Sequence, residues 1–158
     1  MRQIVVFGLG EELYGIDIFD LQEIIRMVEI THIPRAPHFI EGVINLRGRI
    51  IPIIDLKKRF GLADGEITKD SRIIVVNIDD AVAGLIVDHV TEVAALKEED
   101  LEKPPEALTI DARFIQGLAK MGDRIVILIK TSEILNVTEK HQLKYFSKED
   151  TYEEAERT

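Results

Sequence analysis

Short apolar runs rich in Ile and Val recur along the whole chain, and Gly, Asp and Pro residues separate them. This pattern is typical of β-strands joined by tight turns. It predicts three hairpins, over residues 42–46 with 49–54, 72–78 with 81–87, and 114–120 with 124–129. Single strands are predicted over residues 4–7, 14–18 and 27–33. The pattern therefore predicts an all-β fold.

Helices are expected to be few and short. Asp20, with Glu23 three residues later, resembles a capping box, so a helix is expected over residues 21–25 and Glu23 would serve as a structural cap. Further short helices are expected at residues 56–60, which Gly61 ends, and at residues 132–137, which Thr131 caps. The polar, acidic segment 147–158 is expected to be a frayed tail.

The chain also repeats itself. The matched blocks are 4–7 with 73–76 and Gly15 with Gly84 at an offset of 69, and 39–42 with 114–117 and 49–51 with 124–126 at an offset of 75. The change of offset predicts an insertion of six residues in the loop 97–105. Two copies of one five-stranded unit are therefore expected, with 1–69 as the first repeat and 70–137 as the second, inside a single domain of residues 1–146.

Charge and composition narrow the classes of partner. The formal net charge is −9 over 158 residues, which disfavours nucleic acid, because its phosphate backbone needs a basic footprint. The same charge disfavours direct binding to an anionic membrane surface. No apolar stretch approaches the roughly 18 residues needed to cross a bilayer. The sequence has no cysteine, which excludes disulfides and thiolate metal sites and fits a cytoplasmic protein.

No motif for catalysis or cofactor binding stands out. The four histidines, His32, His38, His89 and His141, show no spacing typical of a metal site. The segment from Gly8 to Gly10 lacks the lysine of a phosphate-binding loop, and none of the serines lies in a nucleophile elbow. We therefore expect no enzymatic activity, no cofactor and no metal.

One polar residue of the hairpin at residues 42–54 is distinctive. Gly48 suits a turn position with positive φ, and Arg47 beside it is expected to point outward from the tip. The second copy has Met-Gly-Asp at the equivalent residues 121–123, so the arginine belongs to the first copy alone. Arg47 is either a solvated turn residue or a functional one. Glu23 is either a helix cap or the ion-pair partner of Arg47.

The same hairpin carries a family resemblance. Gly-Val-Ile-Asn-Leu-Arg-Gly at residues 42–48, followed by Ile-Ile-Pro-Ile-Ile-Asp-Leu at residues 50–56, resembles the signature of the CheW family, the coupling proteins of bacterial chemotaxis. Residues 21–24, 33–34, 84–88 and 117–118 also fit that family. The resemblance covers roughly residues 3–137.

The resemblance implies two five-stranded β-barrels with a groove between them, whose strands can be exchanged between the barrels. It implies a cytoplasmic adaptor recruited to membrane-associated receptor arrays. One surface would bind the cytoplasmic tip of a methyl-accepting chemoreceptor, and another the regulatory domain of the histidine kinase CheA. The positions that match the family's receptor-coupling residues are Leu21, Glu23, Gly42 and Arg47, with Asn45, Leu46 and Gly48 supporting the turn. The resemblance assigns no residue to the kinase-facing surface.

Two alternatives to a free-standing coupling protein remain open. The first is a CheW-like module cut from a larger CheV-type protein or from a kinase regulatory protein, which the length of the chain disfavours. The second is a barrel that binds single-stranded nucleic acid, which would need exposed aromatic residues and a basic groove. Only 6% of the residues are aromatic and the chain is acidic, so the adaptor is the favoured interpretation.

Overall fold

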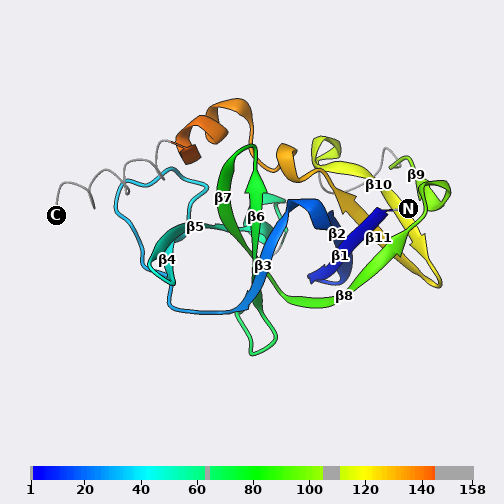
Figure 1. Ribbon diagram of the computed structural model, residues 1–158, viewed down its shortest axis with the longest axis horizontal. Helices are drawn as coiled ribbons and strands as arrows, with labels where there is room; N and C mark the ends of the chain where they lie inside the picture. Colours follow the sequence, from blue (N-terminus) through cyan, green and yellow to red (C-terminus); the bar gives the residue numbers. More distant parts are fainter. Residues whose placement is uncertain (1, 63–64, 105–110, 145–158) are drawn as a thin grey trace.

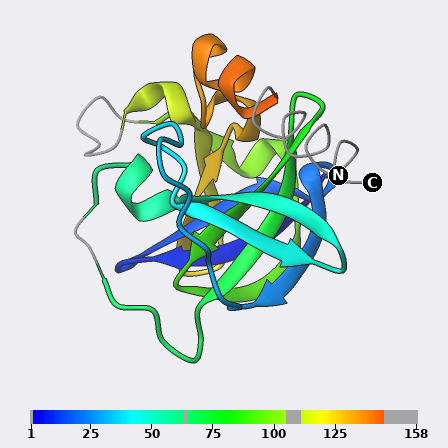
Figure 2. The ribbon, with the colours of Figure 1, turned by 90° about the vertical axis from the view of Figure 1, so that its left-hand side faces the viewer.

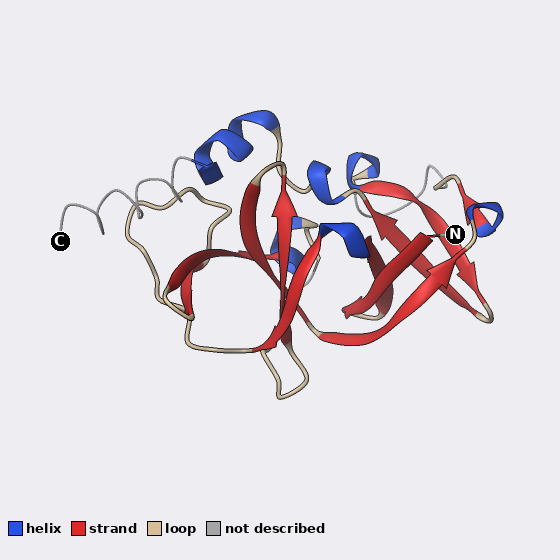
Figure 3. Cartoon of the chain, viewed as in Figure 1, coloured by secondary structure: helices blue, strands red, loops and turns tan. Residues whose placement is uncertain are grey.

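The structure is a computed structural model that describes residues 2–62, 65–104 and 111–144. Its strands are β1 (Arg2–Leu9), β2 (Glu12–Asp17), β3 (Leu21–Arg26), β4 (Gly42–Leu46), β5 (Arg49–Asp55), β6 (Arg72–Ile78), β7 (Ala81–Val87), β8 (His89–Leu96), β9 (Leu101–Glu102), β10 (Ile115–Met121) and β11 (Arg124–Ile129). The helical elements are η1 (Ile18–Asp20), α1 (Leu56–Arg59), η2 (Glu98–Asp100), η3 (Ala112–Phe114), η4 (Thr131–Glu133) and a helix over residues 137–144. The predicted all-β class with a few short helices is confirmed (Figure 3).

The strands form two sheets that lie side by side (Figure 1). Sheet A has the order β8-β1-β2-β11-β10-β9, and sheet B has the order β3-β6-β7-β5-β4. Each sheet therefore takes strands from both halves of the chain. Sheet A has one strand more than the expected five, because the short strand β9 lies in the loop to which the sequence assigned the six-residue insertion. Figure 2 shows the molecule from the side of sheet B.

The duplication is visible in the register of the strands. In sheet B, Ile53 of β5 lies beside Gly84 of β7 in a parallel pair. In sheet A, Leu128 of β11 lies beside Gly15 of β2, again in parallel. These are the same pairs at the offsets of 75 and 69 predicted from the sequence, so the two sheets repeat one pairing scheme.

The two sheets share one large apolar core. A row of aromatic rings runs through it, from Phe7 to Tyr14 at 6.2 Å, from Tyr14 to Phe60 at 6.0 Å and from Phe60 to Phe114 at 5.0 Å between centroids. Burial, together with the charge of Glu12, raises the pKa of Tyr14 to about 12. Burying one large apolar side chain contributes about 1.5–3 kcal/mol, so this shared core holds both sheets as one body.

Two predictions for the segment after β2 are wrong. Residues 21–25, expected to be helical, belong to strand β3, and the expected strand over residues 27–33 is irregular apart from one bridge between Thr31 and Val43. Asp20 caps no helix there. The side chain that caps this region is that of Asp17, which accepts a hydrogen bond from the backbone N–H of Phe19 in η1. Pairing with β6 outweighs the local capping pattern, because it lets the half-buried side chains of Leu21 and Ile24 pack against the shared core.

The second half departs from expectation in two further places. Strand β8 was not anticipated, since its apolar and polar residues match the segment read as a helix in the first half. Thr131 does not cap a helix either: it lies inside η4, and its side chain makes no capping bond. The helix over residues 137–144 instead begins after Asn136, which exchanges backbone and side-chain hydrogen bonds of 2.8 and 2.9 Å with Glu139. The tail predicted at 147–158 lies outside the described residues.

Candidate functional site

The turn between β4 and β5 is built to present Arg47. Both turn residues have left-handed backbones, with φ of 52° at Arg47 and 86° at Gly48. The Asn45 side chain accepts a hydrogen bond of 2.8 Å from the backbone N–H of Gly48 and closes the turn. Leu46 packs against the apolar cluster of sheet B. The Arg47 side chain keeps 69% of its surface exposed, so the turn fixes the backbone while the guanidinium faces solvent.

Arg47 reaches from this turn to strand β3. Its Nη2 donates to Oε2 of Glu23 at 2.5 Å, and the predicted proximity of the two residues is confirmed. The contact joins the opposite edge strands of sheet B, β3 and β4, across the open side of the sheet. An exposed ion pair of this kind stabilises a fold by only about 0–1 kcal/mol. The stability of the fold therefore does not explain why this pair is present.

The second half contains a similar pair, contrary to the expectation that only the first half has one. Glu92 of β8 lies opposite Val6, just as Glu23 lies opposite Val75, and it forms an ion pair with Arg124 of β11. Arg124 is the counterpart of Arg49 rather than of Arg47, because it follows its turn instead of forming part of it. The feature unique to the first copy is therefore an arginine at the turn itself.

The other two predicted residues are less exposed. Leu21 is half-buried and packs against the shared core. Gly42 is buried in β4, where an added Cβ would lie 2.4 Å from the backbone oxygen of Thr31. Thr31 and Val43 exchange backbone hydrogen bonds of 2.8 and 2.9 Å at this point. Gly42 thus allows the segment after β3 to pack against β4, and it is not placed for direct contact with a partner.

Replacing Gly42 with alanine is expected to displace this segment and to lower the free energy of unfolding by about 1–3 kcal/mol, since the new methyl group overpacks a backbone contact. Amide NMR signals of Thr31 and Val43 should shift. Gly122→Ala is the control for the NMR signals: a Cβ there meets open space, so the variant loses stability only through strain at its φ of 65° and should leave Thr31 and Val43 unshifted. Unshifted Thr31 and Val43 signals in Gly42→Ala would contradict the close packing.

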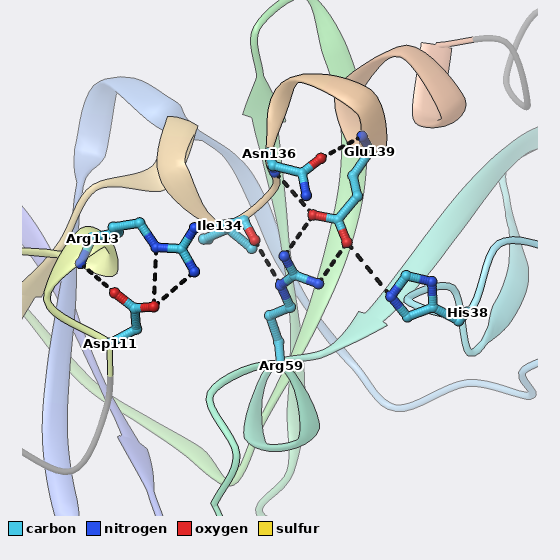
Figure 4. Close-up of polar contacts among 7 residues, drawn as sticks. All are labelled: His38, Arg59, Asp111, Arg113, Ile134, Asn136 and Glu139. Atoms are coloured by element: carbon cyan, nitrogen blue, oxygen red, sulfur yellow. Dashed lines mark hydrogen bonds and ion pairs between the residues drawn. The ribbon is translucent and has the colours of Figure 1, made fainter.

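A buried ion pair that the sequence analysis missed holds the C-terminal helix (Figure 4). Arg59 of α1 donates to both carboxylate oxygens of Glu139, at 2.7 and 2.5 Å, and to the backbone oxygen of Ile134 at 2.8 Å. Glu139 is 4% exposed, and the exposed His38 lies 3.6 Å from its carboxylate. The Asn-x-x-Glu spacing that begins at Asn136 is a capping-box pattern and was the available sequence signal for this helix start.

A second missed contact joins the two sheets where the chain passes from β7 to β8. The Asp88 carboxylate accepts a hydrogen bond of 2.7 Å from the backbone N–H of Gly10, at the β1–β2 turn of sheet A. It also forms an ion pair of 3.2 Å with Lys57 of α1, the short helix that follows strand β5 of sheet B. No local pattern reveals this contact, because Asp88 lies 78 residues from Gly10 in the chain.

Within the described ranges, no group of three or more His, Asp or Glu side chains is arranged to hold a metal ion. No helix in the part of the chain that the structure describes is long and apolar enough to cross a membrane. The described surface has charged side chains on edge strands and turns, which suit the polar rim of a protein interface.

Comparison with known proteins agrees with this geometry. A family model described as "CheW-like domain" matches residues 3–139. The Chemotaxis protein CheW of Treponema pallidum is 37% identical over 146 residues, covering 89% of this chain and 86% of that protein. The Chemotaxis protein CheW of Klebsiella aerogenes is 38% identical over 139 residues, covering 87% and 84%. The crystal structure of the scaffolding protein TtCheW from Thermoanaerobacter tengcongensis superposes with a TM-score of 0.79 at 54% identity, covering 86% of this chain and 88% of that one.

Two sheets that share one core and carry exposed ion pairs on their edge strands define a β-rich scaffold. The chain belongs to the CheW family, and it is a scaffold protein of chemotaxis.

Proposed function

We propose that this scaffold couples the cytoplasmic tip of a chemoreceptor to the regulatory domain of the histidine kinase CheA by holding both at once. The observation that carries the proposal is the exposed Arg47–Glu23 pair, presented by a rigid turn and contributing little to the fold. Family membership supports the choice of partners. The protein would act in the cytoplasm, at membrane-associated receptor arrays.

Arg47 and Glu23 form the centre of the proposed receptor contact. Glu23 fixes one edge of the guanidinium, which leaves the remaining donors of Arg47 for acceptors on the receptor. Leu21 lies two residues before Glu23, but the bulge between them turns Leu21 toward the shared core, so it supports strand β3 beneath the pair. Gly42 contributes indirectly, through the packing of Thr31. Arginine held in this way is favoured at binding hot spots.

Coupling requires that the two partners bind at separate places. A receptor-tip fragment titrated into a preformed complex of this chain with the CheA regulatory domain is expected to give a ternary species, measured by size-exclusion chromatography with light scattering. Arg47→Ala should reduce entry of the receptor fragment and leave the complex with CheA intact. If the receptor fragment displaces CheA stoichiometrically, the coupling function is refuted.

A further inference from the structure

The C-terminal helix over residues 137–144 has two different faces. Glu139 and Leu143 are buried, and Figure 4 shows the Glu139 side chain pointing from the helix toward α1. Helical periodicity places three other residues together on the opposite face. These residues are Val137, His141 and Lys144. The first face holds the helix on the protein, so only the second face can meet a partner.

A groove runs between this second face and the turn of the β6–β7 hairpin. The residues that line it are Asp79, Val137, Lys140, His141 and Lys144. Lys140 and Asp79 form an ion pair of 2.7 Å, and the Lys140 side chain is only 19% exposed. This ion pair closes one side of the groove and fixes the helix against the hairpin. Figures 1 and 2 show the helix, in orange, at the periphery of the molecule.

The groove is positive although the protein is acidic. The formal net charge of the chain is −9, but inside the groove Asp79 compensates only Lys140. Neither Lys144 nor His141 forms an ion pair or a side-chain hydrogen bond with any residue that the structure describes. Salt limits the reach of surface charge to about 8 Å at physiological ionic strength. The local charge of the groove, rather than the net charge of the chain, therefore decides which groups it attracts.

An apolar side chain lies on the same face as these polar groups. Val137 is 70% exposed, which among the large apolar side chains of the described ranges is second only to Phe19. This exposure does not stabilise the fold, because apolar surface stabilises only when it is removed from water. An apolar residue beside charged side chains is typical of a surface that binds protein.

Positive charge alone would also attract nucleic acid or an anionic membrane. Both present negative charge over areas larger than this groove, so the acidic remainder of the surface would repel them. A short protein segment contacts the groove alone, and it can also place an apolar side chain on Val137. The charge and the apolar exposure together therefore favour a protein segment as the occupant.

We propose that this groove docks an acidic segment of a partner protein. A glutamate or aspartate of that segment pairs with Lys144 and accepts a hydrogen bond from His141, and a neighbouring apolar residue packs on Val137. The groove contains none of the residues of the proposed receptor contact. The inference therefore goes beyond the proposed function and does not rest on it.

The probe is a synthetic helical peptide of glutamate and alanine with one central leucine. It is titrated into the isotope-labelled full chain, and binding is followed by amide NMR. The signals of Val137, His141 and Lys144 should shift, and high salt should weaken the binding because exposed charges are screened. Lys144→Glu is expected to weaken binding about tenfold, since a repulsion replaces an attraction. Val137→Ser is expected to weaken it about threefold, because less apolar surface is buried.

The matched controls are Lys97→Glu and Ile67→Ser, which make similar changes at exposed positions outside the groove. Both should bind the peptide within about twofold of the wild type. Arg47→Ala should also bind it as the wild type does, which keeps this inference apart from the proposed function. Unchanged amide signals away from the groove exclude unfolding as the cause of any loss.

Several results would overturn the inference. A peptide with lysine in place of glutamate that binds equally well would show that charge does not select the occupant, and so would unchanged binding in Lys144→Glu. Vesicles of phosphatidylserine that shift the same signals would assign the groove to anionic lipid. Binding only in a variant that lacks residues 147–158 would assign it to the acidic end of this chain. If neither that variant nor the wild type binds the peptide, the groove docks no acidic segment.

Discussion

Glu139→Ala is expected to lower the free energy of unfolding by about 3–5 kcal/mol, the usual cost of removing one partner from a buried ion pair. The substitution leaves the Arg59 guanidinium, whose side chain is 18% exposed, without its bidentate acceptor. It also removes the reciprocal hydrogen bonds with Asn136 that begin the C-terminal helix. Urea denaturation followed by circular dichroism measures the change.

The matched control is the neighbouring pair of Asp111 and Arg113, also drawn in Figure 4. Its side chains are 41% and 74% exposed, so Arg113→Ala, which removes the pair and keeps the Asp111 cap of η3, should leave the free energy of unfolding nearly unchanged. Equal stability losses in Glu139→Ala and Arg113→Ala would show that burial does not distinguish the two pairs in solution.

The dependence of stability on pH gives a second measure of the same contact. Burial alone would raise the pKa of Glu139, but hydrogen bonds from Arg59 and Asn136 outweigh it and hold the pKa below the usual range. The unfolded chain then binds a proton more readily than the folded one. The stabilisation is therefore fully present above the unfolded pKa of about 4.3 and is lost as the pH falls through the lower folded value. Glu139→Gln should lose less stability on acidification than the wild type does.

Arg47→Ala is expected to weaken binding of the receptor tip about thirtyfold, which corresponds to about 2 kcal/mol. The melting temperature should remain nearly unchanged, because the arginine is exposed and its pair with Glu23 is a surface ion pair. Glu23→Ala should weaken binding as well. The double variant should lose less than the two single losses added together, since the residues act as a unit. Titration calorimetry and thermal melts provide the measurements.

Arg124→Ala is the matched control for the Arg47 and Glu23 variants. It removes the equivalent ion pair with Glu92 in sheet A and should leave receptor binding unchanged. Strictly additive losses for Arg47 and Glu23 would mean that the two residues do not cooperate. A large fall in melting temperature for Arg47→Ala would show that the arginine stabilises the fold instead of binding the receptor.

Local pattern was sufficient for much of the fold and for part of the site. The three hairpins follow from apolar runs interrupted by turn residues. A positive φ was predicted at Gly48, and the other two turns also contain one, at Asp79, Asp80 and Gly122. The duplication follows from matched blocks, and the same offsets reappear in the strand register. The proximity of Glu23 and Arg47 was anticipated as one of two interpretations. The competing interpretation, a helix cap at Glu23, was wrong because β3 pairs with β6.

Tertiary structure alone decided how the strands divide between the sheets and which side chains meet where the sheets join. The contacts of Arg59 with Glu139 and of Asp88 with Gly10 span 80 and 78 residues. Periodicity reports only on neighbours within an element, so it cannot place such pairs. The same holds for the contact of Asp88 with Lys57: only the pairing of β5 with β7 in sheet B brings together the two side chains that follow these strands.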